Sequence, residues 1–266
     1  AGVKQGKTAV VNIDDAAGAF MLEHAKCDHL TYAIDAPQAT LRAEDIDVRA
    51  DGACFTLVHP ALGRMELSLH ITGIFNVYNV MSAVGAALAE HIDAAVIKET
   101  LEAFTAVPGR FELVKAGQDF SIIVDYAHTP DALENVIQTI QEIRTPAQQL
   151  IVVCGCGGDR DRTKRPEMAQ IAVKYADTAI FTSDNPRHES PGAILDEMAA
   201  GLDPGARFLR IVDRAEAIRT AAMLSRPGDI LLIAGKGHET YQIIGDVKHH
   251  FDDKEEVGKA FGTLRN

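Results

Sequence analysis

The chain has 266 residues, of which 26 are Lys or Arg and 38 are Asp or Glu, so its formal net charge is −12. This acidic balance argues against binding of nucleic acid along the surface, and no apolar run approaches the roughly 20 residues that a membrane-spanning helix needs. Four cysteines are too few for a disulfide framework and predict a reducing, cytoplasmic setting.

The first hundred residues mix short apolar runs with helical patterns. Asp14 and Asp15 offer an N-cap for a helix that ends near His24, and Asp93 offers a cap for a helix that ends near Phe104. A stretch rich in Ala, Val and Leu predicts a buried helix over residues 77–90. Turns at residues 51–52 and 61–63 are typical of a hairpin or meander. The strands predicted here are 8–13, 30–34, 46–50, 54–59 and 64–71.

The pattern changes at Pro108-Gly109, which we interpret as a domain boundary between residues 1–107 and residues 108–266. Nearly continuous apolar runs then alternate with helical stretches, which is typical of a mostly parallel sheet with helices on both faces. Thr129-Pro130 supplies one helix with a cap and a Pro at its first position. We therefore predict an α/β fold. The predicted strands are 120–124, 150–153, 179–182, 208–212 and 230–234, the helices 130–143, 166–176, 191–201 and 214–225, and the terminal hairpin 241–251.

Polar side chains and glycines cluster directly after four of these five strands, at residues 125–128, 155–161, 183–187 and 235–239. Because ligands bind at the carboxyl ends of parallel strands, we expect these loops to converge on one site. The clusters hold arginines, which bind carboxylate or phosphate, and carboxylates, which bind ammonium groups. Because these loops carry both positive and negative side chains, they predict a zwitterionic ligand. The alternative is that these are ordinary surface loops, which are polar and glycine-rich in most proteins.

Two further patterns fall short of known ligand motifs. Residues 2–8 (GVKQGKT) are one residue shorter than the phosphate-binding loop G-x-x-x-x-G-K-[ST] and precede a strand pattern instead of a helix. Cys154 and Cys156 have no second Cys or His pair nearby, so we interpret them as buried thiols rather than zinc ligands. We predict no metal site in this chain.

Six motifs between residues 73 and 239 carry a family resemblance. They are Gly73-x-Phe75-Asn76-x-x-Asn79, Val107-Pro108-Gly109-Arg110-Phe111-Glu112, Val124-Asp125-Tyr126-Ala127-His128-Thr129-Pro130, Gly155-Cys156-Gly157-Gly158-Asp159-Arg160-Asp161, Asp184-Asn185-Pro186-Arg187 and Ala234-Gly235-Lys236-Gly237-His238-Glu239. In this order the set resembles the Mur ligase family, and the likeness extends along the whole chain. A chance match to six ordered motifs is negligible.

The resemblance implies part of a multidomain ligase. Family members have a uridine-nucleotide-binding domain, a central ATPase domain and a Rossmann-like C-terminal domain. The chain is similar to the later part of the central domain (1–107) and the whole amino-acid-binding C-terminal domain (108–266). The first domain, the phosphate-binding loop, the magnesium ligands and the family's carbamylated lysine have no counterpart in this sequence. We therefore expect no complete catalytic set and no activity of the chain alone. The absence of an initiator Met also indicates a part of something longer.

The family's reaction activates a carboxylate with ATP and Mg²⁺ as an acyl phosphate, which the amino group of an incoming amino acid then attacks. The members that this chain resembles use meso-2,6-diaminopimelate as the amino acid and UDP-MurNAc-L-Ala-D-Glu as the acceptor. They act in peptidoglycan precursor synthesis, and so in cell-wall biogenesis, cell shape and cell division. The resemblance thus implies three small-molecule partners, namely ATP, meso-diaminopimelate and UDP-MurNAc-L-Ala-D-Glu. It implies no binding to nucleic acid or to a membrane.

Five residues match the family's nucleotide-binding positions. Asn76 and Asn79 match asparagines beside the adenine, and an amide offers the donor and the acceptor that a base edge needs. Arg110 matches a nucleotide-binding arginine, Asp125 a ribose-side aspartate, and His128 a position near the nucleotide. Two alternatives stay open, namely that Asn76 and Asn79 cap a helix, a role that Asn76 could combine with nucleotide binding, and that Asp125 caps the helix that follows it.

Seven residues match the family's amino-acid pocket: Arg160, Asp184, Asn185, Pro186, Arg187, Gly235 and Glu239. The resemblance links Asp-Asn-Pro-Arg to diaminopimelate, since lysine-adding relatives lack this arginine. The Arg187 guanidinium would bind the distal carboxylate that lysine lacks, and Asp184 and Glu239 would bind the distal ammonium. An arginine left unpaired beside lysine costs on the order of 1–3 kcal/mol. The alternative for Arg187 is an ion pair with Glu189 or Asp184.

Two other functions stay open at this point. One is a lysine-adding, folate or cyanophycin-type ligase of the same superfamily, against which Arg187 argues. The other is a non-catalytic amino-acid-binding module, which the missing phosphate-binding loop favours.

Overall fold

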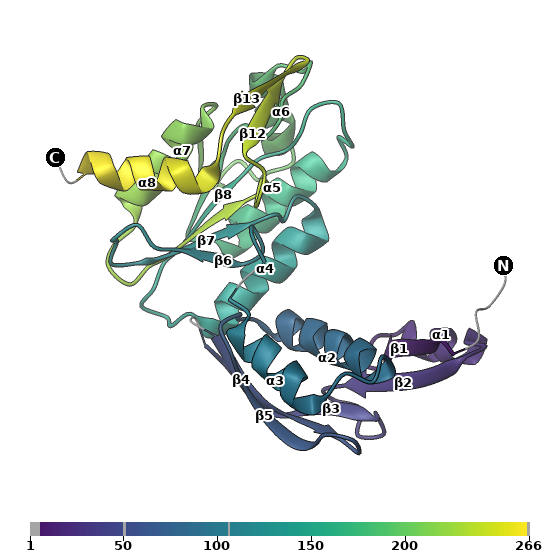
Figure 1. Ribbon diagram of the computed structural model, residues 1–266. Helices are drawn as coiled ribbons and strands as arrows, with labels where there is room; N and C mark the ends of the chain where they lie inside the picture. Colours follow the sequence, from purple (N-terminus) through teal and green to yellow (C-terminus); the bar gives the residue numbers. More distant parts are fainter. Residues whose placement is uncertain (1–5, 50–51, 106, 265–266) are drawn as a thin grey trace. The chain divides into compact units, whose positions relative to one another are not determined.

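The computed structural model describes residues 6–49, 52–105 and 107–264 (Figure 1). The chain divides into two compact units, residues 1–106 (unit 1) and residues 107–266 (unit 2). Among the residues described, no helix is long and apolar enough to cross a membrane.

Unit 1 is built on a five-stranded sheet in the order β1-β2-β3-β4-β5. The first three strands pair in parallel, and the last two continue the sheet as an antiparallel meander. Helices α2 and α3 bury apolar side chains against the sheet. The elements are β1 (Thr8–Asn12), α1 (Gly18–His24), β2 (Asp28–Ala33), β3 (Leu41–Arg49), β4 (Gly52–His59), β5 (Gly63–Leu69), α2 (Ile74–Ala89) and α3 (Ala94–Ala103).

The two predicted helix caps of unit 1 have different outcomes. The cap at Asp93 is confirmed, because its carboxylate accepts the N–H of Ala95 at the start of α3 (2.8 Å). The cap at Asp14 or Asp15 is wrong, since α1 begins only at Gly18 and its N-cap is Ala17. Asp14 instead accepts hydrogen bonds from the backbone after β2 and from the Tyr78 hydroxyl (2.9 Å).

The third strand of unit 1 is longer than the sequence pattern indicates. It begins at Leu41 instead of Ile46, because a bulge between Glu44 and Asp47 interrupts the alternation of buried and exposed side chains. Residues 50 and 51, which the prediction placed at a strand end and a turn, lie outside the described residues, as do residues 2–5 of the loop-like GVKQGKT sequence.

Unit 2 is built on a six-stranded sheet in the order β10-β9-β8-β11-β7-β6. All neighbours pair in parallel except β6, which runs antiparallel to β7. A separate hairpin, β12–β13, follows the last parallel strand. The elements are β6 (Glu112–Val114), β7 (Ser121–Asp125), α4 (Pro130–Ile143), β8 (Leu150–Cys154), α5 (Lys164–Tyr175), β9 (Thr178–Phe181), α6 (Pro191–Ala199), β10 (Phe208–Arg210), α7 (Arg214–Leu224), β11 (Ile230–Ala234), β12 (Tyr241–Ile244), β13 (Val247–His250) and α8 (Asp253–Leu264).

Helices cover both faces of this sheet (Figure 1). Helices α4, α5 and α6 contact one another in sequence, and α7 and α8 form a second pair. Buried side chains of α7 and α8 share one apolar cluster with alternate residues of β7, β8 and β11. Strands β7, β8 and β11 are buried almost completely, as their continuous apolar runs predict. The predicted α/β fold, with a mostly parallel sheet between helices, is confirmed.

Two elements of unit 2 were not predicted. Strand β6 has only three residues, all half-buried, so it leaves almost no pattern in the sequence. Helix α8 carries few buried apolar side chains, and its first residue, Asp253, is fully buried in an ion pair with Arg214 at the start of α7. That pairing depends on two residues far apart in the chain.

Candidate functional site

The carboxyl ends of four parallel strands of unit 2 surround one cavity. The loops after β7, β8, β9 and β11 line it together with the start of β12, and its volume is about 480 Å³. These four strands are neighbours in the sheet, which explains why their loops converge. We name it the strand-end pocket, and its lining residues are Tyr126, His128, Thr129, Gly155, Gly157, Arg160, Asp161, Lys164, Asp184, Asn185, Arg187, Gly235, Glu239 and Tyr241.

The hairpin β12–β13 fixes the backbone of Arg187. The N–H of Arg187 donates to the carbonyl of Ile243 (3.0 Å), and its own carbonyl accepts the N–H of Gly245 (2.8 Å). With a φ of 49°, Arg187 adopts a left-handed conformation that a side chain takes up only where surrounding contacts impose it. The tertiary structure therefore sets the backbone conformation from which the Arg187 side chain extends.

The Arg187 guanidinium has carbonyl partners only. Its Nη1 donates to the carbonyl oxygens of Gly158 (2.9 Å) and Asn185 (3.4 Å). Within the described parts of the chain, no carboxylate lies within 4.0 Å of it. The alternative pairing with Glu189 is wrong, because Glu189 binds the buried Arg165 instead (2.8 Å). The positive charge of the Arg187 guanidinium is therefore not neutralised by a described carboxylate and can bind an anionic group of a ligand.

The other proposed carboxylate partner of Arg187 is also engaged elsewhere. Asp184 lies 3.8 Å from the ammonium of Lys236. Arg160, the second arginine of the pocket, is exposed and donates from Nη1 to the carbonyl of Asp159 (3.0 Å).

An acidic cluster forms the part of the pocket that includes Asp184, Asn185 and Glu239. The Asn185 amide donates from Nδ2 to Glu239 Oε2 (2.9 Å), and the Lys236 ammonium donates to Asn185 Oδ1 (3.1 Å) and to Glu239 Oε2 (3.4 Å). Lys236 is fully buried, and this burial lowers the pKa of its ammonium, against the opposing attraction of Asp184 and Glu239.

Glycines allow the pocket loops to approach one another closely. Gly235 has a φ of 118°, and a Cβ there would lie 2.9 Å from Asp184 Oδ2. At Gly158 a Cβ would lie 1.9 Å from the carbonyl oxygen of Pro186. Pro186 itself is buried and does not line the pocket, although its carbonyl lies close to Gly158 in the loop after β8.

Asp125 and His128 shape the loop after β7. Both carboxylate oxygens of Asp125 accept backbone N–H groups, one from Phe111 and one from Ala127 (2.7 Å each). Burial raises the pKa of Asp125, and these two bonds and Arg110 act in the opposite direction. The alternative role of Asp125 as a helix cap is wrong, because the Thr129 hydroxyl caps α4.

His128 lines the pocket, and its ring Nδ1 lies 2.8 Å from the carbonyl of Tyr126. The carbonyl of His128 accepts from the Lys164 ammonium (2.6 Å), which joins this loop to the start of α5. Arg110 does not line the pocket; its guanidinium lies over the Tyr126 ring, 4.8 Å from the ring centre.

Asn76 and Asn79 lie in unit 1, on the first two turns of α2. The alternative role of Asn76 and Asn79 as helix caps is wrong, since the N-cap is Gly73. Asn76 donates from Nδ2 to the carbonyl of Thr72 (2.8 Å), and Asn79 donates from Nδ2 to Asn76 Oδ1 (3.1 Å). The two amides thus form a hydrogen-bonded chain on one helix face.

The pocket therefore joins most of the amino-acid set chosen from the sequence. Arg160, Asp184, Asn185, Arg187, Gly235 and Glu239 all line it, and so does His128 from the nucleotide set. Sequence reasoning did not select Tyr126, Lys164, Lys236 or Tyr241. Tyr126 and Lys236 stand inside the motifs quoted above, so the motif was the available signal, whereas Tyr241 was read only as the start of a hairpin.

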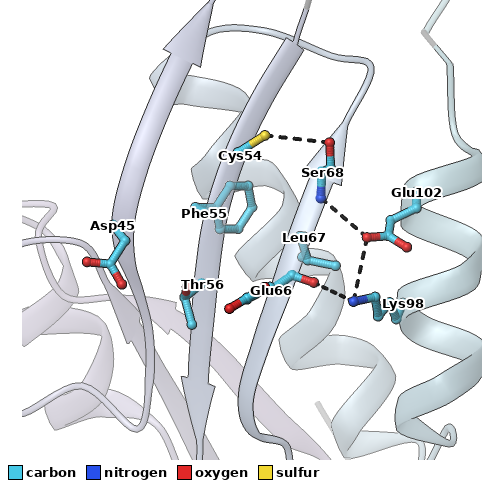
Figure 2. A pocket seen from close by; sticks show the side chains of 9 residues that line it. All are labelled: Asp45, Cys54, Phe55, Thr56, Glu66, Leu67, Ser68, Lys98 and Glu102. Atoms are coloured by element: carbon cyan, nitrogen blue, oxygen red, sulfur yellow. Dashed lines mark hydrogen bonds and ion pairs between the residues drawn. The ribbon is translucent and has the colours of Figure 1, made fainter.

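Unit 1 has a hollow of its own, which Figure 2 shows on the β4–β5 face beside α3. Several of its polar groups bind one another: Lys98 donates to the Glu66 carbonyl (2.8 Å), and Glu102 accepts from the N–H of Ser68 (3.4 Å). Cys54 donates to the Ser68 hydroxyl (3.5 Å). We do not assign a function to it.

The cysteines of the Cys154-x-Cys156 pair are buried free thiols, as predicted. Burial raises the pKa of Cys156 to about 12, which leaves it protonated. Over the described residues, no group of three or more His, Cys, Asp or Glu side chains is placed to bind a metal ion.

Family models match most of the chain. Residues 1–87 match the Mur ligase middle domain, and residues 109–237 match the Mur ligase glutamate ligase domain.

Among curated relatives, UDP-N-acetylmuramoyl-L-alanyl-D-glutamate–2,6-diaminopimelate ligase of Oceanobacillus iheyensis is 48% identical over 256 residues, which are 96% of this chain and 51% of that protein. The ligase of the same name from Bacillus licheniformis is 49% identical over 97% of this chain and 52% of its own length. The chain thus spans about half the length of the relatives it matches.

Solved structures agree with this assignment. A structure of a UDP-N-acetylmuramoyl-L-alanyl-D-glutamate–2,6-diaminopimelate ligase superimposes with a TM-score of 0.67 and 40% identity, over 98% of this chain and 54% of that one. The folylpolyglutamate synthase of Thermotoga maritima has the same TM-score at 16% identity, over 88% of this chain and 52% of that one, and shares the fold alone. The motifs, the fold and these matches together show that the chain consists of middle- and C-terminal-domain sequence of the Mur ligase family and belongs to that family.

Proposed function

We propose that this chain is part of an ATP-dependent ligase that adds meso-2,6-diaminopimelate to UDP-MurNAc-L-Ala-D-Glu in peptidoglycan precursor synthesis, and that the strand-end pocket binds the diaminopimelate. The observation that carries the proposal is the Arg187 guanidinium, which lines the same cavity as Asp184 and Glu239 and has no carboxylate partner among the described residues. The names of the curated relatives support the same reaction.

The pocket offers a partner for each distal group of diaminopimelate. Arg187 binds the distal carboxylate, with Arg160 adding positive charge at the open side. Asp184 and Glu239 bind the distal ammonium. The amino group at the other end of the ligand is then free to act as the nucleophile, after loss of a proton. Lysine has no distal carboxylate, so it would leave the Arg187 guanidinium with its carbonyl partners alone.

The nucleotide-binding role of Asn76, Asn79, Arg110, Asp125 and His128 is part of the same proposal. Asp125 already accepts two backbone N–H groups, and a carboxylate can accept further hydrogen bonds. Asp125 is buried and does not line the strand-end pocket. It would therefore hold the loop after β7 in shape and offer its remaining lone pairs to a ribose hydroxyl.

The whole ligase uses ATP and Mg²⁺ to form the acyl phosphate and works in the cytoplasm. The described residues do not offer a set of side chains that fits Mg²⁺. Residues 1–266 also contain no G-x-x-x-x-G-K-[ST] sequence. The role of this chain is thus to bind and orient the amine, and we expect no turnover by the chain alone.

The test is isothermal titration of meso-diaminopimelate and of L-lysine into the 266-residue chain and into Arg187→Ala. We expect the parent to prefer diaminopimelate by roughly 5- to 150-fold, the equivalent of about 1–3 kcal/mol for an unpaired charged group. Arg187→Ala should lose that preference. Arg219→Ala, an exposed arginine on α7, is the matched control and should keep it. Equal affinity of the parent for both ligands would favour a lysine-adding ligase instead.

A further inference from the structure

A lysine beneath the strand-end pocket has no role in the proposal so far. Lys236 follows β11 in a tight loop between Gly235 (φ 118°) and Gly237 (φ 54°). Its side chain has an exposed fraction of 0%, and it does not line the pocket. A buried ammonium is costly unless charges and hydrogen bonds compensate it.

The compensation comes from the residues proposed to bind the ligand. Lys236 donates to Asn185 Oδ1 (3.1 Å) and Glu239 Oε2 (3.4 Å), and its Nζ lies 3.8 Å from Asp184 Oδ1. The cluster thus combines two carboxylates with one internal ammonium. Its net charge is negative by one unit, which matches a single ligand ammonium.

Lys236 also determines how the Asn185 amide is oriented. Asn185 Oδ1 accepts from two donors, the Lys236 ammonium and the N–H of Ile243 (2.9 Å). This leaves Nδ2 to donate to Glu239 (2.9 Å). The amide therefore transmits the position of Lys236 to the Glu239 carboxylate.

Other ionisable groups around Lys236 do not change this balance of charge. Arg214 and Asp253 are both fully buried and pair with each other in bidentate geometry. The Tyr241 ring centre lies 5.7 Å from the Lys236 ammonium, and Cys156, near Asp184, is a neutral thiol. Arg160, Lys164 and Arg187 also line the pocket, but among the described residues none of them forms an ion pair with Asp184 or Glu239. The charge within the cluster is thus that of Lys236 and its two carboxylates.

We propose that Lys236 is a positioning residue, which holds the acidic cluster at one net negative charge so that the cluster binds one ammonium of a diamino acid without a change in protonation. This inference rests on the proposed function. Without Lys236 the two carboxylates would repel each other, and one would retain a proton. The ligand ammonium would then have to displace that proton.

The experiment measures protons released on binding. Meso-diaminopimelate is titrated calorimetrically at pH 6 in two buffers of different ionisation enthalpy, into the parent chain, Lys236→Met and the control Lys174→Met, an exposed lysine of α5. Lys236→Met should release up to about one proton more than the parent, because the ligand displaces the proton that the carboxylate pair retains, and Lys174→Met should release the same number as the parent. An equal number for the parent and Lys236→Met, with binding retained, would overturn the inference and leave the proposed function standing.

A second variant separates the charge from a general loss of structure. Lys236→Met/Glu239→Gln again carries one net negative charge in the cluster, so the extra proton release should disappear although the affinity is lower. Persistence of the extra release in this double variant would overturn the inference. Absence of meso-diaminopimelate binding by the folded parent would overturn the proposed function and the inference together.

If Lys236→Met binds meso-diaminopimelate too weakly for calorimetry, the inference is tested on the protein without ligand. Carboxyl-carbon NMR titration of Asp184 and Glu239 should then show proton uptake by this pair at a higher pH in Lys236→Met than in the parent. Identical titration curves would overturn the inference, because a purely structural lysine leaves the charge of the pair unaffected.

Discussion

The buried pair of Arg214 and Asp253 makes a strong prediction about stability. Arg214 donates from Nε and Nη2 to the two carboxylate oxygens of Asp253 (2.7 Å each), and both side chains have an exposed fraction of 0%. Arg214 also donates to the carbonyls of Ala234 (3.1 Å) and Ser183 (3.5 Å), which directly precede two of the pocket loops. The pair thus anchors α8 and supports the ends of β9 and β11.

Replacing Asp253 by Ala leaves the guanidinium buried without its counter-ion. Such a change costs about 3–5 kcal/mol, and in a unit of this size each kcal/mol lowers the Tm by about 2–4 °C. We therefore expect Asp253→Ala to lower the Tm of unit 2 by about 6–20 °C. The double variant Arg214→Met/Asp253→Leu removes both charges, so it should lie much nearer the parent.

Differential scanning calorimetry of the 266-residue chain measures these shifts. The control is Arg219→Ala, on the same helix α7, whose side chain is 43% exposed and pairs with Glu216 (2.7 Å). Exposed pairs of this kind contribute about 0–1 kcal/mol. The reasoning is refuted if Asp253→Ala lowers the Tm no more than Arg219→Ala does, or if the double variant is as unstable as Asp253→Ala.

Three further predictions concern the pocket and the chain as a whole. Gly235→Ala should weaken binding of meso-diaminopimelate in a calorimetric titration, because its methyl would lie 2.9 Å from Asp184 Oδ2 at a φ of 118°; Gly258→Ala, with open space around it, is the control, and equal affinities would contradict the prediction. The hydrogen bonds from Arg165 lower the pKa of Glu189 from 4.5 to about 2, so its contribution to stability is complete above pH 4.5 and is lost as the pH falls to about 2. Urea unfolding across that range should show a flatter pH dependence for Glu189→Gln than for the parent, and equal slopes would count against this role. Finally, the chain mixed with ATP, Mg²⁺ and both substrates should release no phosphate above background, a prediction that measurable, substrate-dependent release would disprove.

Much of the fold of unit 2 follows from local sequence patterns. The parallel strands are buried on both faces, so they appear as continuous apolar runs that are hard to confuse with exposed segments. The cap at Thr129 with Pro130 at the first helical position marks the start of α4 correctly. Strand ends followed by glycine and charged residues also indicate where loops converge, because the sheet topology brings those ends to one edge.

Patterns that depend on distant partners could not be predicted in this way. Asp14 has the sequence context of a helix cap, yet it binds the backbone after β2 and the Tyr78 hydroxyl on α2. The bulge in β3 and the short strand β6 likewise depend on pairing with neighbouring strands. The residues around a position do not show which distant group will bind its side chain or its backbone in the folded protein.

Local sequence patterns predict the fold class, the family and the residues that gather at the carboxyl edge of the second sheet. The pairing of their charges follows only from the folded structure. In the folded protein Glu189 pairs with Arg165, and Arg187 binds carbonyl groups. The buried Lys236 lies against Asp184 and Glu239. The physical reason is that ion pairing depends on distances of a few ångströms between side chains from different strands, and these distances exist only once the sheet has formed.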